Sequence, residues 1–157
     1  MKNTNKTIYQ RISRPSDVNL GGNAHGGAVM TWIDEAAFIC AGTWAKGYCV
    51  TVYAGGIRFI RPIKIGHEVK IISQVIYTGK TSIHISCDVY SRELVMPDFV
   101  QTTHCVIVFV AIDDDGKPRP VEKWEPKNDY ERNLEKYAIK LKELRKDIEK
   151  EMKPFMH

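Results

Sequence analysis

Residues 26–46 restrict the fold more than any other stretch, because their pattern is helical and apolar almost all round. Met30, Trp32 and Ile33 already occupy more than one face of such a helix. A helix without a polar face is normally buried on all sides, so the rest of the chain is expected to wrap around it. Gly47 follows directly and predicts the end of the helix.

Four partly alternating segments rich in β-branched residues follow this helix and are typical of strands. They cover residues 49–63, 67–77, 81–93 and 99–112, and residues 7–13 predict a short first strand. Ile83, Ile85, Cys87 and Val89 fall on one face of their strand. Because the connectors are short and carry turn residues, we expect an antiparallel meander that curls around the helix. That arrangement leaves a sheet face or edge for a partner, which favours a dimer.

Residues 128–153 predict a second helix of a different kind. Apolar residues recur at steps of three and four, and lysines and glutamates form a solvated face between them. We expect this helix to pack on the sheet or on a neighbouring subunit. The sequence therefore divides into residues 1–124, a wrapped-helix domain, and residues 125–157, a helical extension.

Composition excludes several classes of function for this chain of 157 residues. A formal net charge of +4 is too small to indicate nucleic acid, and no stretch reaches the roughly 20 apolar residues of a membrane span. The four cysteines are scattered and the five histidines lack metal-ligand spacing. We expect a reduced, cytoplasmic protein that binds no metal, no nucleic acid and no membrane.

Asp34 and Glu35 lie inside the apolar helix and have no basic residue one turn away. An unpaired buried carboxylate must find a partner, shift its pKa or line a wet cleft, and catalytic carboxylates line such clefts. Gly26 and Gly27 add backbone N–H groups at the helix start, where the helix dipole stabilises negative charge. A carboxylate that activates water and donors that hold an oxyanion suit the hydrolysis of an acyl compound.

Structural explanations stay open for the same residues. Either carboxylate could bond to a strand N–H or to an arginine such as Arg58 or Arg61. Residues 21–27, "GGNAHGG", could form a tight turn and a cap in which Asn23 or His25 bonds to the first helical turn. Residues 79–82, "GKTS", are not a nucleotide-hydrolase loop, because Gln74 stands where that motif needs glycine.

Three segments together are similar to the hotdog-fold acyl-CoA thioesterases, above all to the YciA-type and brain-type acyl-CoA hydrolases. These segments are "NAHGGAVMTWIDEAA", "VTVYAGGIRFIRPIKIGHEV" and "GKTSIHISCDVYSRE", and the resemblance covers residues 8–121 in the right order. It implies an α+β hotdog fold, in which one long buried helix is wrapped by a curved antiparallel sheet. The amphipathic C-terminal helix is longer than that core requires.

The resemblance also implies roles for single residues. Asp34 matches the catalytic carboxylate, acting as general base or nucleophile, and Asn23 matches an asparagine supplied by the other half of a dimer. Gly26 and Gly27 would polarise the thioester carbonyl. The positions near the coenzyme A region are His25, Arg61, Lys80, Thr81 and Ser82. One departure from the family pattern is the pair Gly55 and Gly56, where many relatives carry an acidic residue.

We therefore expect an acyl-CoA thioesterase that acts as a homodimer, with the trimer of dimers common among relatives as a further assembly. No cofactor is expected, because coenzyme A is part of the substrate. Two alternatives stay open. One is an acyl-CoA-binding module without catalysis, and the other is a hotdog hydratase or dehydratase, whose histidine motif is not found in the sequence.

Overall fold

A computed structural model describes residues 4–157. Its strands are β1 (Lys6–Ile12), β2 (Cys49–Phe59), β3 (Glu68–Thr78), β4 (Ser82–Arg92) and β5 (Val100–Ala111). Its long helices are α1 (Gly26–Ala45) and α2 (Asp129–Met152), and Pro15–Asp17 and Lys153–Phe155 form short 3₁₀ turns. The two helices and five strands expected from the sequence are confirmed.

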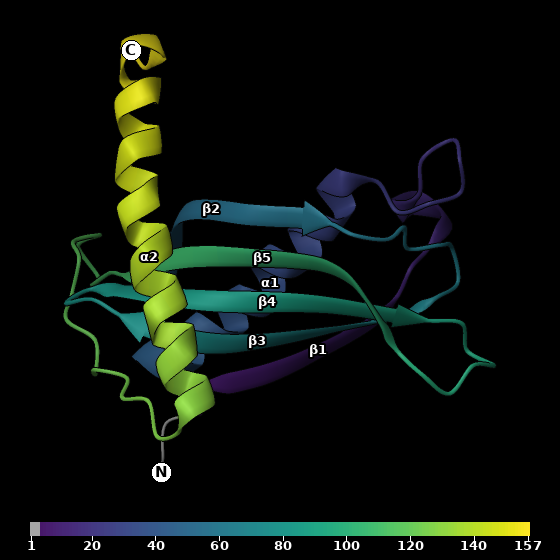
Figure 1. Ribbon diagram of the computed structural model, residues 1–157, viewed down its shortest axis with the longest axis horizontal. Coiled ribbons are helices and arrows are strands. Elements are labelled where there is room, and N and C mark those ends of the chain that lie inside the picture. Colours follow the sequence, from purple (N-terminus) through teal and green to yellow (C-terminus); the bar gives the residue numbers. More distant parts are fainter. Residues whose placement is uncertain (1–3) are drawn as a thin grey trace.

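The strand order corrects the expected meander. The sheet runs β1-β3-β4-β5-β2 with antiparallel neighbours, so only β3, β4 and β5 form a meander, and β2 pairs with β5 rather than with β3. Short turns keep β3, β4 and β5 adjacent, and β1 occupies the free edge of β3. The strand that follows α1 can then pair only beside β5, which makes β2 an open edge of the sheet (Figure 1).

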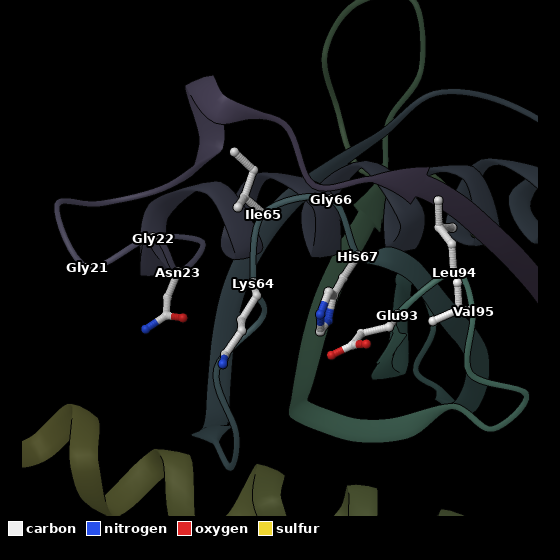
Figure 2. Close-up of a pocket in the computed structure, with 10 residues that line it drawn as sticks. All are labelled: Gly21, Gly22, Asn23, Lys64, Ile65, Gly66, His67, Glu93, Leu94 and Val95. Carbon is white, nitrogen blue, oxygen red and sulfur yellow. The ribbon is translucent and has the colours of Figure 1, made fainter.

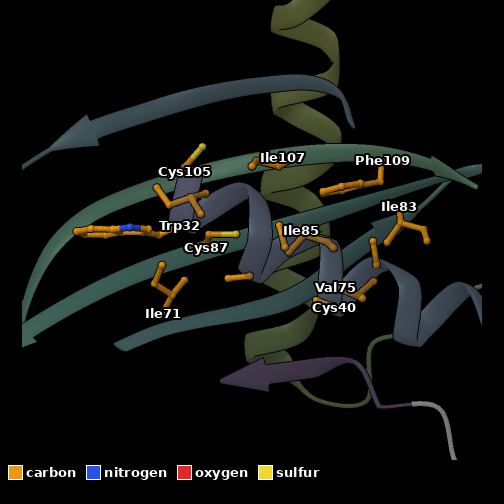
Figure 3. Close-up of a cluster of buried hydrophobic side chains, with 14 of the residues drawn as sticks. Trp32, Cys40, Ile71, Val75, Ile83, Ile85, Cys87, Cys105, Ile107 and Phe109 are labelled. Atoms are coloured by element: carbon orange, nitrogen blue, oxygen red, sulfur yellow. The ribbon is translucent and has the colours of Figure 1, made fainter. Parts of the chain in front are cut away.

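The main core lies between α1 and the concave face of the sheet. Trp32 and Cys40 of α1 are buried against inward-facing residues of the strands (Figure 3), and Ile33 belongs to the same cluster. Ile83, Ile85, Cys87 and Val89 all point into this core, as their alternation predicted. The four cysteines are free thiols and all are buried, which agrees with their expected role as small core residues.

The sheet wraps α1 only in part, which corrects the expectation that the helix is buried on every side. One face of the helix stays exposed in the single chain, and it carries Thr31, Asp34, Glu35, Phe38 and Ile39. The open edge at β2 explains this, because a five-stranded sheet does not close around a helix.

The two ends of α1 have local causes. His25 caps the start, because its Nδ1 accepts a hydrogen bond from the Ala28 amide at 3.0 Å. The last helical residue is Ala45, one residue before the predicted end, because Lys46 is the C-cap and adopts the left-handed conformation with φ 55°. The Gly47 amide then bonds to the Gly42 carbonyl and satisfies one of the last carbonyls of the helix.

Helix α2 crosses the face of the sheet that points away from α1 (Figure 1). Its first half buries Ala138 against Ile76 and Val106, which confirms packing on the sheet. Its second half runs past the edge at β2, where Leu144 and Ile148 are about half exposed. The Lys- and Glu-rich remainder of the helix is solvated, as expected.

Candidate active site

Asp34 lies on the exposed face of α1 and is held by a residue of β2. Its Oδ1 accepts a hydrogen bond of 2.7 Å from the Thr51 hydroxyl. The partner is thus neither a strand N–H nor an arginine, the two structural partners that the sequence suggested. Thr51 was not predicted, because a threonine in a strand is ordinary and only the fold brings it to the helix. The bond fixes one carboxylate oxygen and leaves Oδ2 without a protein partner among the described residues.

Glu35, the neighbouring carboxylate, makes a structural contact. The hydroxyl of Tyr9 in β1 donates to Glu35 Oε2 at 2.8 Å, so this side chain ties α1 to the sheet edge opposite β2. Burial, and then the hydrogen bond to Glu35, raise the pKa of Tyr9 above its ordinary value. The two adjacent carboxylates therefore have different environments: Asp34 faces outward beside Thr51, and Glu35 bonds to Tyr9.

The start of α1 presents free donors. Within residues 4–157, the amides of Gly26 and Gly27 make no hydrogen bond, whereas the next amide, of Ala28, is capped by His25. A Cβ at Gly27 would lie 3.3 Å from His25 Nδ1, so a glycine at this position leaves space for the capping imidazole. Two unbonded N–H groups at a helix N-terminus can hold a carbonyl oxygen that gains negative charge.

A cavity of about 360 Å³ adjoins this helix start. It brings together three of the predicted site residues, Asn23, Gly26 and Arg61, with the ring of Phe59. The Arg61 guanidinium is anchored there by a 2.8 Å hydrogen bond from Nη1 to the Gln101 carbonyl. The cavity has the mixed apolar and polar lining that a small-molecule site needs.

A second hollow of about 510 Å³ shares Asn23 with this cavity. Figure 2 shows the side chains of Lys64, His67 and Glu93 around it. His67 Nδ1 is buried and has no hydrogen-bond partner in the described part of the chain. Sequence reasoning assigned neither Lys64 nor His67 to the site, because no motif marks them.

The turn of Lys80, Thr81 and Ser82 is not brought to the helix start within one chain. The Thr81 carbonyl accepts from the Ala111 amide, and Ala111 pairs with Cys49, which follows the end of α1. The turn therefore lies at the end of the sheet opposite Gly26. Asp34 and Thr51 are likewise absent from the cavity that holds Asn23.

Comparison with known proteins places this arrangement in a family. Residues 21–96 match the thioesterase superfamily. The acyl-CoA thioester hydrolase YciA of Salmonella typhimurium is 32% identical over 117 residues, which are 73% of this chain and 88% of that protein. The chain belongs to the thioesterase superfamily. Protein VdlD of Helicobacter pylori is 30% identical over 140 residues, 89% of this chain and 80% of that protein.

Solved structures share the fold of this thioesterase-superfamily member. An apo-hexameric acyl-CoA thioesterase superimposes with a TM-score of 0.86 and is 33% identical, over 91% of this chain and 92% of that one. The acyl-CoA hydrolase of Staphylococcus aureus, solved with butyryl coenzyme A, coenzyme A and coenzyme A disulfide, gives a TM-score of 0.88 and 29% identity, over 96% and 92%. The hotdog fold expected from the resemblance is thereby confirmed.

Structures of the S. aureus enzyme also exist with an asparagine, an aspartate or a threonine replaced by alanine. The asparagine precedes the aspartate by fifteen positions, and the threonine follows it by seventeen.

Two further features of the thioesterase-superfamily chain bear on its site. Among residues 4–157, no three His, Cys, Asp or Glu side chains gather closely enough to hold a metal ion. In the same part of the chain, no helix is both long and apolar enough to cross a membrane.

Proposed function

We propose that this chain hydrolyses acyl-CoA thioesters to a free carboxylic acid and coenzyme A, with Asp34 as the catalytic carboxylate. The observation that carries the proposal is the Asp34–Thr51 hydrogen bond of 2.7 Å. The two residues stand at the same separation as the aspartate and threonine substituted in the S. aureus enzyme. Relatives named acyl-CoA thioester hydrolases support the same reaction.

In this reaction the carboxylate of Asp34 removes a proton from water, and the resulting hydroxide attacks the thioester carbon. The bond from Thr51 orients Oδ1, so the unbonded Oδ2 is the oxygen that accepts the proton. The amides of Gly26 and Gly27 receive the developing oxyanion. Collapse of the tetrahedral intermediate expels the thiolate of coenzyme A, which takes up the proton. Direct attack by Asp34 to form an anhydride is the other route open to this geometry.

Asp34 and the helix-start cavity meet when two chains assemble. Strand β2 is an open edge with Thr51 near one end and Phe59 at the other, beside Gly26. Antiparallel pairing of two β2 strands about a two-fold axis would place Thr51 of one chain near Phe59 of the other. It would also cover exposed apolar side chains such as Phe38 and Val52. The hexameric state of the apo thioesterase and of other related structures supports a homo-oligomer, and the β2 pairing is our proposal for its dimer.

Two asparagines are candidates for the side-chain amide that the partner chain contributes to the site. Asn23, the residue that the resemblance suggested, lines the cavity. Asn19 stands fifteen positions before Asp34, the separation found for the asparagine of the S. aureus enzyme. Its Oδ1 accepts from the amides of Gly21 at 2.9 Å and Asn23 at 3.4 Å, which leaves its amide N–H₂ group for a ligand. The spacing favours Asn19 over Asn23.

The test measures coenzyme A release from acyl-CoAs of short, medium and long chain length. Asp34→Asn should lose at least about a hundredfold in rate, as removal of general-base catalysis does. Glu35→Gln is the matched control, since it neutralises the adjacent carboxylate, which bonds to Tyr9, and should retain activity. Equal rates for wild type and Asp34→Asn, or acyl-CoA binding without any release, would overturn the proposal.

Mixed assemblies test the shared site. Asn19→Ala and Asp34→Asn protomers, each inactive alone, are unfolded together and refolded in equal amounts. About one quarter of wild-type activity should return, because half of the dimers are hybrids and each hybrid has one intact site. Activity lost in Asn23→Ala but kept in Asn19→Ala would reassign the amide to Asn23. No recovery when Asp34→Asn is mixed with Asn19→Ala, or in a second mixture with Asn23→Ala, would mean that each site is built from one chain.

A further inference from the structure

Helix α2 and the outer face of the sheet enclose a cavity of about 180 Å³ that the proposed reaction does not use. Tyr53 of β2, Val106 and Val108 of β5, and Leu141 and Arg145 of α2 form much of its wall. It lies on the side of the sheet away from α1, since α2 crosses that face (Figure 1). The sheet thus separates it from Asp34.

The pair Gly55 and Gly56 in β2 helps to create this cavity. A Cβ at Gly55 would lie 2.5 Å from the Tyr53 ring, so the ring lies over Gly55 only because that side chain is missing. Gly56 has φ +63°, a conformation that residues with side chains rarely adopt. Both glycines line the cavity, and neither contributes a side chain that would fill it.

The cavity is cationic and has no carboxylate in its lining. Among residues 4–157, buried Arg145 Nε has no hydrogen-bond partner. Its ion-pair contact, Glu149 Oε1, is 3.6 Å away, beyond hydrogen-bonding distance. The guanidinium lies over the Tyr53 ring, 4.9 Å from the ring centroid. Lys142 supplies a second positive charge to the lining. A buried guanidinium N–H left unbonded is costly, and an anion would satisfy it.

His84 adds a neutral polar group at the floor of the cavity. Burial, and then the charges of Arg145 and Lys142, lower the pKa of His84 to about 4. The imidazole is therefore uncharged at neutral pH, and the charge of Arg145 and Lys142 stays uncompensated by any group in the lining.

We propose that this cavity binds a short-chain aliphatic carboxylate. The carboxylate group takes the position beside Arg145 and Lys142, and the alkyl chain lies against Val106, Val108 and Leu141. A volume of about 180 Å³ is below the roughly 300 Å³ at which drug-sized sites begin, which limits the ligand to a short chain. A free carboxylate is also what the proposed hydrolysis releases. That link rests on the proposed function, whereas the binding site itself does not.

The experiment is calorimetric titration of the full-length protein with sodium hexanoate at constant ionic strength, in the presence of saturating coenzyme A. Arg145→Gln should weaken hexanoate binding at least about tenfold, as the loss of a charge-assisted hydrogen bond does. Lys146→Gln removes an equal charge one residue further along α2, on an exposed side chain, and should bind like wild type. Uncharged 1-hexanol should bind at least tenfold more weakly than hexanoate.

A second variant and a second readout keep the inference testable if Arg145→Gln does not fold. Val108→Phe fills the cavity from the sheet side and should abolish binding. In wild type, nuclear magnetic resonance shifts of the His84 ring should move on addition of hexanoate, because the ring faces the cavity.

Several outcomes would overturn the inference. The first is that hexanoate does not bind, as expected where a second copy of the chain fills the cavity. The second is that wild type and Arg145→Gln bind hexanoate equally. The third is that hexanoate binds only when coenzyme A is left out. Release of coenzyme A from acyl-CoA is measured on the same preparation. An active enzyme that binds no hexanoate overturns this inference alone, and an inactive protein that binds hexanoate overturns the proposed function alone.

Discussion

Acidification should destabilise this fold through one side chain, His84, which is only 3% exposed between α2 and the sheet. Its ring packs edge-on against Tyr77, with the ring centroids 4.9 Å apart. Burial is the first cause that lowers its pKa to about 4, from an ordinary 6.5, and the charges of Arg145 and Lys142 on α2 act in the same direction. A protonated imidazole in this position would be desolvated and would face two cations.

The pKa difference fixes the sign and size of the effect. Between about pH 6.5 and pH 4 the unfolded chain binds the proton and the folded chain does not, so stability falls as the pH falls through this window. At about 1.36 kcal/mol for each unit of pKa difference, the loss approaches about 3 kcal/mol near pH 4. Above pH 6.5 both states are neutral at this position, and the contribution is fully retained.

The assay is urea unfolding at about pH 7 and about pH 4.5, with protein concentration held fixed because assembly also stabilises the folded state. His84→Gln keeps a polar side chain and removes the titration, so its free energy of unfolding should fall by about 2 to 3 kcal/mol less than that of wild type over this interval. His157→Gln, at the exposed C-terminal residue, should behave as wild type. Equal losses in wild type and His84→Gln would refute a buried neutral histidine.

Three further outcomes are expected. Ile85→Ala should lower the free energy of unfolding in urea by about 2 to 5 kcal/mol, because Ile85 is fully buried. Ile8→Ala, at an exposed position, should change it by less than about 0.5 kcal/mol. Similar losses for the two variants would contradict the assigned core. Native protein should react slowly with a thiol reagent at pH 8 and quickly after denaturation, since burial raises the pKa of Cys40 to about 12 and raises that of Cys87 further; rapid labelling before denaturation would show an accessible thiol. Asn128→Ala should lower the free energy of unfolding by about 1 kcal/mol and the melting temperature with it, because Asn128 Oδ1 accepts from the Glu131 amide and caps α2. An unchanged melting temperature would show that this cap does not stabilise the fold.

Local patterns were sufficient for the secondary structure and for one residue of the site. Alternation of Ile83 and Ile85 with polar neighbours identified a strand and the face that it turns to the main core, since strand side chains point to opposite faces in turn. A carboxylate at Asp34, without a local cation, marked a position that needs an explanation from outside the helix. The sequence left Asn23 and His25 as the two candidates for the cap of this helix, and the structure shows that His25 is the one that accepts from the first turn.

Contacts between distant segments could not be obtained in this way. Thr51 is seventeen residues from Asp34, and nothing in the strand pattern distinguishes it from other strand threonines. The pairing of β2 with β5 depends on which sheet edge is free after β1 and β3 have paired. The mistaken meander arose from the assumption that strands close in sequence pair in space.

By itself, then, the sequence determined which segments become helix or strand, which side chains of the strand at residues 82–92 point into the main core, and which carboxylate in α1 lacks a local partner. These properties depend on the periodicity of side chains within a single helix or strand. Tertiary structure alone decided that α1 keeps an exposed face, that Thr51 orients Asp34, and that α2 closes a cationic cavity over the outer face of the sheet. Each of these depends on strand order and helix placement, which are set by the packing of the whole chain rather than by any local pattern.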